Sequence, residues 1–348
     1  MTPLNGHRVV AFGAMSTRPL ARLFASLGAE VVATEPSLEA LEGASFLIED
    51  LGLALLGDAG LEREAIEARF PALVHVSVTT FGSFGPRARW RGGELVASAM
   101  GGVLRLTGEP DRPPVKEALD ACLFHADMVA ASGAMAAHHS RGTDGRGQHV
   151  DVSVQEVAFS RNVNGILVWQ FDRRKLHRVG GALNYGIATV RCIWPLADGW
   201  CFHTLMTGRF GAPANQAVSD WMDELGVPNP LRGVDWLAYN RSTLPAETRA
   251  KWEAALETFF RRLTRAQIRD EGRRRGINAC AVATPHDVLA DAHLQARDFW
   301  KDTPDGREPR RFAAWRDGAA AAAVAPGTAP AAPPSMRPGP LAGLRVLD

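Results

Sequence analysis

The chain has 348 residues, of which 46% are apolar, 22% are charged and 7% are aromatic. That apolar content excludes a wholly disordered chain, and the length is enough for two folded domains. The formal net charge is +1, so composition gives no electrostatic argument for a nucleic-acid partner or an anionic membrane.

The cysteines point to neither a metal site nor a disulfide framework. They form no CxxC pair and show no ligand spacing with histidine. We therefore expect no metal, reduced and buried thiols, and a cytoplasmic location. The start, "MTPLNGHRVVAFG", lacks the charged-then-apolar pattern of a signal peptide, and no apolar stretch approaches the ~20 residues that span a bilayer. The four cysteines are Cys122, Cys192, Cys201 and Cys280.

Strands and helices alternate through the first half of the chain with short connections. This order predicts a parallel sheet with helices on both faces. Thr17 is the expected N-cap of the first helix, and Gly28 is expected to end it. We expect strands at 7–11, 29–36, 45–49, 72–82 and 147–154, and helices at 17–28, 61–70, 93–102, 119–140 and 154–171.

The composition changes after residue 188. Two apolar runs around the turn 197–199 predict a β-hairpin over 189–205. Helical segments are expected at 214–226 and 245–276. Residues 277–300 read as strand, turn and helix, with Thr284 as the cap and Pro285 at the first helical position.

The end of the chain resembles its own beginning. "PLAGLRVLD" (340–348) matches "PLNGHRVVA" (3–11) at five of nine positions. Residues 317–339, which directly precede the second of these segments, are almost entirely Ala, Pro and Gly. Such a composition cannot bury a core and predicts a linker. We therefore expect a large domain (1–188), a small domain (189–300), a return segment (301–316), a linker (317–339) and the start of a second module (340–348), whose tail is expected to be disordered or to stray onto a sheet edge.

Several motifs in series resemble the class III CoA-transferase family of the CaiB/BaiF type. Each motif is weak alone, but their order and spacing fit over most of residues 3–300. The resemblance also suggests the N-terminal half of a tandem, two-module member. The motifs are "LFASLGAEVVATEP" (23–36), "VSVTTFGSFGP" (76–86), "GGELVASAMGG" (92–102), "LTGEPDRPP" (106–114), "GRGQHVDVSVQE" (145–156), "PLADGWCFHTL" (195–205) and "GINACAVATPHDVLADAHLQARDFW" (276–300).

The resemblance implies an α/β fold. A Rossmann-like large domain with a parallel sheet is split in sequence by an inserted, smaller α/β domain, and two subunits thread through each other as an interlocked dimer. Members move CoA between an acyl-CoA and a carboxylic acid, or racemise 2-methylacyl-CoA thioesters. Coenzyme A is then a substrate and not a covalently held cofactor. The implied partners are these substrates and either a second copy of the chain or a second CoA-transferase module.

Family transferases attack the thioester with one Asp carboxylate, which forms a mixed anhydride and then an enzyme-bound CoA thioester. In this chain the motif spacing assigns that Asp to position 123, nine residues after Pro114 and 22 residues before Gly145. Position 123 is Leu, which cannot form an anhydride. The resemblance therefore implies that this half is catalytically degenerate.

Two nearby carboxylates are candidate replacements. Asp120 is one helical turn from Leu123, although one turn displaces a carboxylate by ~5 Å, which favours a helix-capping role for it. Glu94 keeps the acidic position of "GGEL", which lies beside the catalytic carboxylate in family transferases; a helix N-terminal carboxylate is the equal alternative. Asp127, if it points inward, is expected to pair with His125 or an Arg.

The racemase branch uses a His–Asp pair for proton exchange beside the thioester. Its His position is Gly93 here, and its Asp position is again Leu123. Both members of the pair are missing, so an isomerase function is disfavoured.

The CoA site implied by the resemblance has lost its cations. Ala33 stands where the family usually has Lys, Asp50-Leu51-Gly52 replaces Asn-Phe-Arg, and the intervening segment 37–44 carries Glu39 and Glu42. Phosphate binding normally needs cationic partners or a free helix N-terminus. In the surviving "TTFGSFGP" loop, Phe81, Gly82 and Gly85 are the candidates for shaping a pantetheine channel, unless the glycines only make the turn.

Three functions follow from these observations. The chain is a degenerate module that pairs with an active one, or an active transferase that has recruited Asp120 or Glu94, or a non-catalytic scaffold that binds acyl-CoA without turning it over. A nicotinamide dehydrogenase is a poor fourth, because the first strand is followed by "FGAMSTRP" and not by G-x-G-x-x-G.

Overall fold

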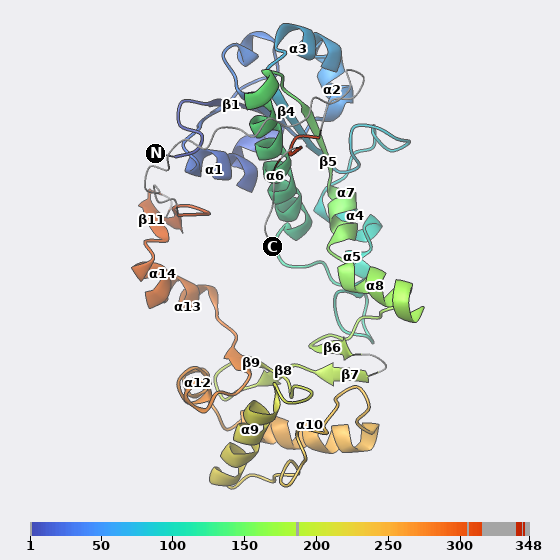
Figure 1. The fold of residues 1–348 in the computed structure, drawn as a ribbon, viewed down its shortest axis with the longest axis vertical. Coiled ribbons are helices and arrows are strands. Elements are labelled where there is room, and N and C mark those ends of the chain that lie inside the picture. Colours follow the sequence, from blue (N-terminus) through green and yellow to red (C-terminus); the bar gives the residue numbers. More distant parts are fainter. Residues whose placement is uncertain (1, 186–187, 305, 315–338, 343, 345–348) are drawn as a thin grey trace. The chain divides into compact units, whose positions relative to one another are not determined.

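The structure is a computed structural model that describes residues 2–185, 188–304, 306–314, 339–342 and 344. The chain divides into two compact units (Figure 1). Unit 1 comprises Met1–Arg105, Lys116–Arg173 and Asp298–Asp348, and unit 2 comprises Leu106–Val115 and Arg174–Arg297. Unit 1 is thus made of three separate stretches of sequence. The stretches 106–115 and 174–188, which were predicted to be part of the large domain, belong to unit 2, and 298–300, predicted in the small domain, belong to unit 1.

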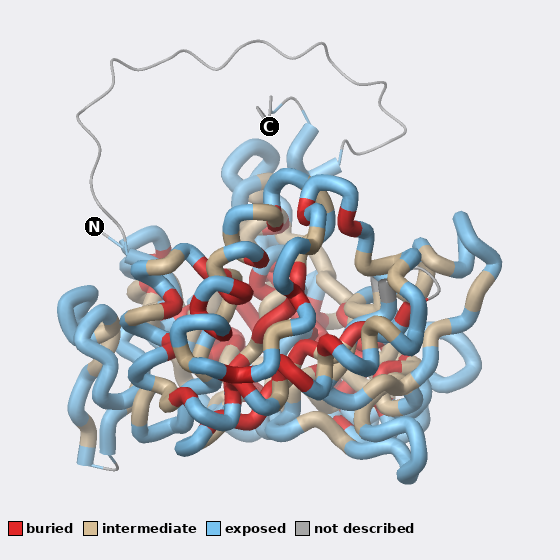
Figure 2. The backbone as a smooth tube through the Cα atoms, turned by 90° about the horizontal axis from the view of Figure 1, so that it is seen from below, coloured by how far each residue is buried: buried red, intermediate tan, exposed pale blue. Residues whose placement is uncertain are grey.

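A five-stranded parallel sheet forms the centre of unit 1, in the order β2-β1-β3-β4-β5. The predicted α/β class and parallel sheet are confirmed. The central strands β1, β3 and β4 are almost wholly buried, whereas the edge strand β2 is partly exposed. Buried residues are the red segments of Figure 2. The strands are β1 (Arg8–Phe12), β2 (Glu30–Ala33), β3 (Phe46–Glu49), β4 (Val74–Thr79) and β5 (His149–Ser153).

Helices cover both faces of this sheet. On one face, α1 (Pro19–Ser26) and the long α6 (Ala121–Asp144) pack against Val9, Phe46 and Val76. On the other face, α2 (Gly52–Asp58) and α3 (Arg63–Arg69) bury Leu56 and Ile66 against β1 and β3. The rest of unit 1 contains α4 (Glu94–Met100), α5 (Val103–Leu106, which ends at the unit boundary), α7 (Val154–Ser160), α8 (Val163–Asp172), the hairpin β11 (Trp300–Thr303) and β12 (Gly306–Pro309), and the short helices η1 (Gly13–Thr17) and η2 (Glu39–Leu41).

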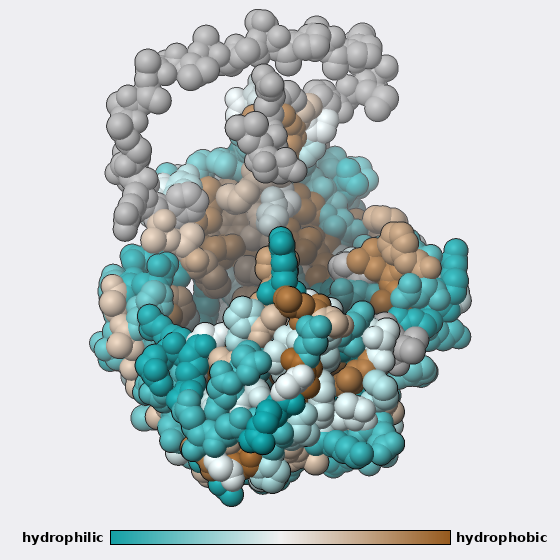
Figure 3. Space-filling view, turned by 60° about the horizontal axis from the view of Figure 1, so that its bottom comes forward, coloured by the Kyte–Doolittle hydropathy of each residue, from teal (hydrophilic) through white to brown (hydrophobic). Residues whose placement is uncertain are grey.

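Unit 2 is built on a three-stranded antiparallel sheet, in the order β10-β9-β8. Its core is aromatic, with Trp194, Trp221, Trp252 and Phe260 among the buried side chains. The nearer surface in Figure 3 is mostly hydrophilic, with separated hydrophobic side chains. The elements are β6 (Ala182–Tyr185), β7 (Ala188–Arg191), β8 (Ile193–Pro195), β9 (Trp200–His203), α9 (Ala212–Glu224), α10 (Ala246–Phe260), α11 (Arg265–Gln267), η3 (Ile268–Gly272), α12 (Arg273–Arg275), β10 (Ala279–Ala281), α13 (Pro285–Ala290) and α14 (Ala292–Ala296).

Local signals were predicted with mixed success. Thr284 caps α13 in a capping box with Pro285 in the first turn, as predicted. The predicted cap at Thr17 is wrong: Thr17 belongs to η1 and Arg18 is the N-cap residue of α1, because the chain turns through a 3-10 helix first. The single helix predicted over 154–171 is two helices that divide at residues 161–162.

Three further expectations concern cysteines, membranes and the end of the chain. Cys122, Cys192 and Cys201 are buried free thiols as predicted, whereas Cys280 is exposed, which corrects the expectation for that residue. Among the described residues, no helix is long and apolar enough to cross a membrane. The predicted linker, apart from Gly339, and residues 343 and 345–348 of the predicted second module lie outside the described residues.

Candidate active site at the start of α6

The start of α6 is capped by a carboxylate from another helix. Glu94, the first residue of α4, accepts hydrogen bonds from the backbone N–H groups of Cys122 and Leu123 on its two oxygens, both at 2.9 Å. These N–H groups lie in the first turn of α6 and have no partner within the helix. Glu94 is 6% exposed, and its two hydrogen bonds hold the carboxylate in place. It therefore lies directly beside position 123 and also acts as a helix N-terminal carboxylate.

Position 123 contains no group that can attack a thioester. The Leu123 side chain is half-buried and packs against the main core of unit 1. Its neighbour Cys122 is fully buried, and burial together with the adjacent Glu94 raises the pKa of this thiol. A raised pKa reduces the thiolate fraction, so Cys122 is not a substitute nucleophile.

Arg161 on the outgoing end of α7 completes this site, and the sequence analysis missed it. Its guanidinium donates to the Glu117 carboxylate at 2.8 and 3.1 Å and to the Cys122 sulfur at 3.4 Å. The pKa of Arg161 is raised by the bonds to Glu117 although burial opposes the shift. The signal in the sequence was a single Arg between two apolar helical stretches, which pattern reasoning alone does not separate from a surface residue.

Asp120 is placed away from this arrangement. It is the N-cap residue of α6 by position, but its side chain makes no capping hydrogen bond. Its carboxylate is 65% exposed and pairs with Lys116 at 3.3 Å. The favoured capping role is therefore corrected for the side chain, because Glu94 already occupies the N–H groups that Asp120 would cap.

Asp127 is fully buried and pairs with an arginine, one of the two partners expected for it. Arg18 donates to both of its oxygens, at 2.5 and 3.3 Å, and the N–H of Leu20 donates at 3.3 Å. Burial raises the pKa of Asp127 while Arg18 opposes the shift. His125 instead contacts the carbonyl oxygen of Ala121. Asp127 thus ties α6 to the start of α1, which is a structural role.

A pocket of about 510 Å³ opens at the carboxyl ends of β1, β2 and β3. This is the edge of a parallel sheet where open α/β folds bind ligands. Ala33 lines the pocket where the family's lysine was expected, and Glu35 is the charged side chain among its lining residues. The pocket is lined by Gly13, Ala33, Thr34, Glu35, Pro36 and Leu51. Next to it, Asp50 accepts a hydrogen bond from the N–H of Ala14, and burial raises the pKa of Asp50.

The loop after β4 contains the three predicted CoA-binding residues. Phe81 packs edge-on against Trp90, with 6.0 Å between ring centroids. Gly82 is buried with φ of +83°, and a Cβ on it would lie 3.3 Å from the Asp151 carboxylate, so glycine is needed for this turn. Gly85 is exposed with φ of +90° and open space around it. Their role in CoA binding stays a prediction.

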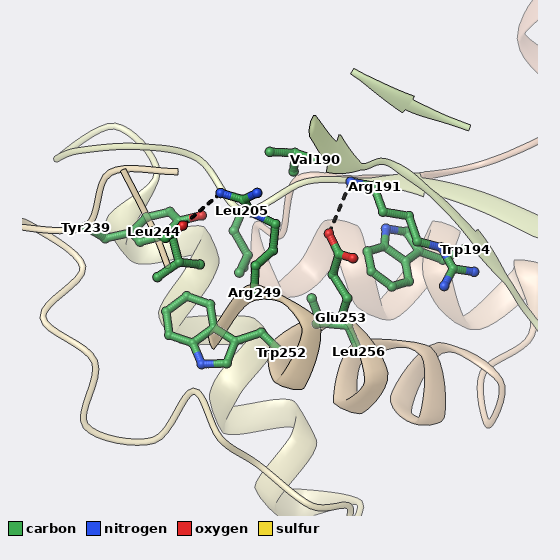
Figure 4. Close-up of a pocket in the computed structure, with 10 residues that line it drawn as sticks. All are labelled: Val190, Arg191, Trp194, Leu205, Tyr239, Leu244, Arg249, Trp252, Glu253 and Leu256. Carbon is green, nitrogen blue, oxygen red and sulfur yellow. Dashed lines mark hydrogen bonds between the residues drawn. The ribbon is translucent and has the colours of Figure 1, made fainter. Parts of the chain in front are cut away.

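One small cavity of unit 2 is a packing gap and not a substrate site. It measures about 30 Å³ and lies among the side chains of Figure 4, where Arg249 donates to the carbonyl of Leu244 and Glu253 accepts from the N–H of Arg191. Such a volume holds only one or two water molecules. In the described part of the chain, no cluster of three His, Cys, Asp or Glu side chains is arranged to hold a metal ion.

The fold and site define an α/β protein with an open pocket at the carboxyl edge of a parallel sheet. Comparison with protein families makes this specific: the model of CoA-transferase family III matches residues 38–336. The chain therefore belongs to CoA-transferase family III, as its motifs predicted.

Relatives and solved structures agree with this assignment. The chain is 31% identical, over 74% of its length, to subunit BbsE of succinyl-CoA:(R)-benzylsuccinate CoA-transferase from Thauera aromatica, and the match spans 62% of that subunit. It is 26% identical to the succinyl-CoA–D-citramalate CoA-transferase of Chloroflexus aurantiacus, over 85% of this chain and 82% of that enzyme. A CaiB/BaiF family protein from Brucella suis has the same fold, with a TM-score of 0.76, 23% identity and coverage of 91% and 93% of the two chains.

Proposed function

We propose that this chain is a class III CoA-transferase module without its own nucleophile. It pairs with another module of the family, and the pair transfers CoA between an acyl-CoA and a carboxylic acid in the cytoplasm. The single observation that carries the proposal is Leu123 at the nucleophile position, directly beside a Glu94 that still caps α6.

The two candidate replacement nucleophiles do not favour an active isolated chain. Glu94 uses both oxygens to accept N–H groups at 2.9 Å, so attack would cost it a helix cap. Asp120 is exposed and paired with Lys116. Attack on a thioester needs a carboxylate in a defined near-attack position. Neither residue meets that requirement while its present contacts hold.

The pairing part of the proposal has two supports. Exposed apolar side chains gather on α4 and α8, including Leu95, Leu167 and Trp169. The similar BbsE protein is named as a subunit. A second copy of this chain is the other candidate partner.

The alternative without catalysis is a scaffold that binds acyl-CoA. The pocket at the sheet edge favours binding, whereas Glu35 in its lining opposes a polyphosphate; the adjacent Asp50 is paired with Arg18 at 3.9 Å. Racemase activity remains disfavoured, because Gly93 and Leu123 replace both members of the proton-exchange pair.

The test is CoA exchange by the isolated chain between succinyl-CoA and added carboxylic acids. We expect wild-type turnover at the background rate. Leu123→Asp restores a carboxylate beside Glu94, and we expect it to form an acyl or CoA adduct, whereas the matched Leu123→Asn variant forms none. Turnover by the wild-type chain would overturn the proposal. An inert Leu123→Asp variant would show that more than the nucleophile has been lost.

A further inference from the structure

Five polar side chains form a row inside unit 1, on the sheet face that also packs against α2 and α3. We call them the buried polar row: Glu49, His75, Ser77, His149 and Asp151. Strand register explains why they meet, since Glu49 pairs with Ser77 and Ser77 with Asp151, while His75 pairs with His149. Strands of a parallel sheet are usually apolar on both faces. Glu49 and Ser77 are nevertheless 0% exposed, and His75 is 4% exposed.

Glu49, His75, Ser77 and His149 are connected by polar contacts across three strands, whereas Asp151 joins the row through its strand register beside Ser77, and His149 and Asp151 are half-buried. Glu49 Oε1 lies 3.4 Å from His75 Nε2, and Ser77 Oγ lies 3.3 Å from that same nitrogen. Ser77 Oγ is also 2.8 Å from His149 Nε2. The contact between Glu49 Oε1 and His75 Nε2 is an electrostatic one and not an aligned hydrogen bond, and it is strongest when His75 Nε2 carries a proton. The Ser77 hydroxyl can donate to His149 Nε2.

The first end of the row anchors the turn after β3. Glu49 Oε2 accepts the N–H of Gly52 at 2.7 Å, which closes the turn containing Leu51. Leu51 lines the pocket at the sheet edge. Gly52 has φ of +78°, and a Cβ on it would approach the Thr79 methyl to 3.2 Å, so this turn lies against the end of β4.

The other end of the row anchors the loop after β4. Asp151 accepts the N–H of Ser83 at 3.0 Å and the Ser83 hydroxyl at 2.8 Å. This loop contains Phe81 and Gly82. One row of side chains therefore supports both loops at the edge where the family resemblance expects the CoA substrate.

The charges in the row depend on one another. The close contact and charge of His75 lower the pKa of Glu49 although burial alone would raise it, so Glu49 is ionised at neutral pH. Burial and the neighbouring His75 and Arg63 lower the pKa of His149 to about 4, against the opposing effect of Asp151 and Glu49. His149 is therefore neutral at pH 7 and can accept from Ser77.

We propose that Glu49 and Asp151 are positioning residues that fix the loops 50–52 and 80–85 from one buried row, and that protonation of His149 loosens this support. A proton on His149 Nε2 removes the acceptor of the Ser77 hydroxyl. The Ser77 hydroxyl then accepts from His149 and has to turn its own proton toward Glu49 or His75, which changes the contacts at the Glu49 end of the row. The titratable and charged groups that face His149 are His75, Glu49, Asp151 and Arg63. The assignment of acyl-CoA to this edge rests on the proposed function, but the support of the two loops does not.

Hydrogen exchange of the full chain, read by mass spectrometry, tests this proposal without any ligand. We expect Glu49→Gln to raise the exchange rate of the Gly52 amide by about tenfold at pH 7.5, and Asp151→Asn to do the same for Ser83, since each amide loses a charge-assisted acceptor. Peptide 128–140 of α6, which packs against the opposite face of the same sheet, reports unfolding of unit 1 as a whole and should not change. Unchanged exchange at both amides would overturn the positioning role, and Asp151→Asn keeps the test available if Glu49→Gln fails to fold.

The pH dependence separates a proton-sensitive support from a merely structural one. After correction for intrinsic rates, the Gly52 amide of the wild type should exchange several-fold faster at pH 4.5 than at pH 7.5. In His149→Gln, whose amide does not titrate, this acceleration should disappear. If it persists, His149 is not the sensor. Calorimetry with CoA at both pH values reads ligand binding separately, so failure of CoA binding remains distinguishable from failure of the row.

Discussion

The start of α6 and the carboxyl edge of the sheet differ in what each has kept of its expected chemistry. At the start of α6, Glu94 holds the first turn and Arg161 pairs with Glu117, but Leu123 stands where the resemblance expects the nucleophile. At the sheet edge the pocket is open, but its charge is acidic through Glu35. The comparison teaches that contacts which also stabilise the fold, such as those of Glu94, can be present without a carboxylate at position 123.

Removal of the Glu94 carboxylate should have the largest effect on stability. Glu94→Ala leaves the N–H groups of Cys122 and Leu123 buried without acceptors, which costs about 2–4 kcal/mol of unfolding free energy. Glu94→Gln keeps one acceptor oxygen and should cost about half as much. Urea denaturation measures both variants. Equal stability of Glu94→Ala and wild type would show that the carboxylate was kept for chemistry and not for the fold.

Acidification should weaken both units through their buried histidines. Burial lowers the pKa of His149 in unit 1 and of His203 in unit 2 to about 4, below the 6.5 of the unfolded chain. Between pH 6.5 and 4 the unfolded state binds more protons, so stability falls as the pH falls. We expect a loss of about 1–2 kcal/mol for each histidine between pH 7.5 and 5, measured by urea denaturation. Stability that rises over this interval would contradict the assignment.

A cation introduced at the sheet edge should raise the affinity of this region for CoA. Ala33→Lys places an ammonium group beside the pocket, and we expect CoA affinity to rise about fivefold, equivalent to about 1 kcal/mol. Ala33→Gln is the uncharged control of similar length. Isothermal titration calorimetry measures both. An equal gain in the two variants would mean that contact area and not charge limits binding.

Substitution of Asp120 should have the smallest effect on stability and on CoA exchange. Its exposed ion pair with Lys116 is expected to contribute less than about 0.5 kcal/mol, so Asp120→Ala should unfold at nearly the wild-type urea concentration. The same variant should leave any CoA-exchange signal unchanged. A loss of exchange in Asp120→Ala, with Asp120→Asn equally inactive, would instead identify this carboxylate as a recruited nucleophile.

The sequence predicted the parallel sheet and the family because both depend on patterns that are local or serial. Alternating strands and helices, the Thr284 cap and the motif order are examples. Contacts between distant segments were harder to predict from the sequence. Glu94 and its partner Cys122 in α6 are 28 residues apart in the sequence, and Arg18 and Asp127 are 109 apart. The buried polar row did leave a signal, since "VHVSVT" and "HVDVS" alternate polar and apolar residues in a sheet expected to be apolar on both faces.

The central claim is that no carboxylate of this chain replaces the missing nucleophile, and the mass of the intact protein tests it most directly. The isolated wild-type chain is incubated with succinyl-CoA, with and without hydroxylamine, which traps acyl anhydrides and thioesters. The account predicts an unmodified mass in both samples. A mass increase corresponding to an acyl, CoA or hydroxamate group, mapped to Glu94 or Asp120, would contradict it.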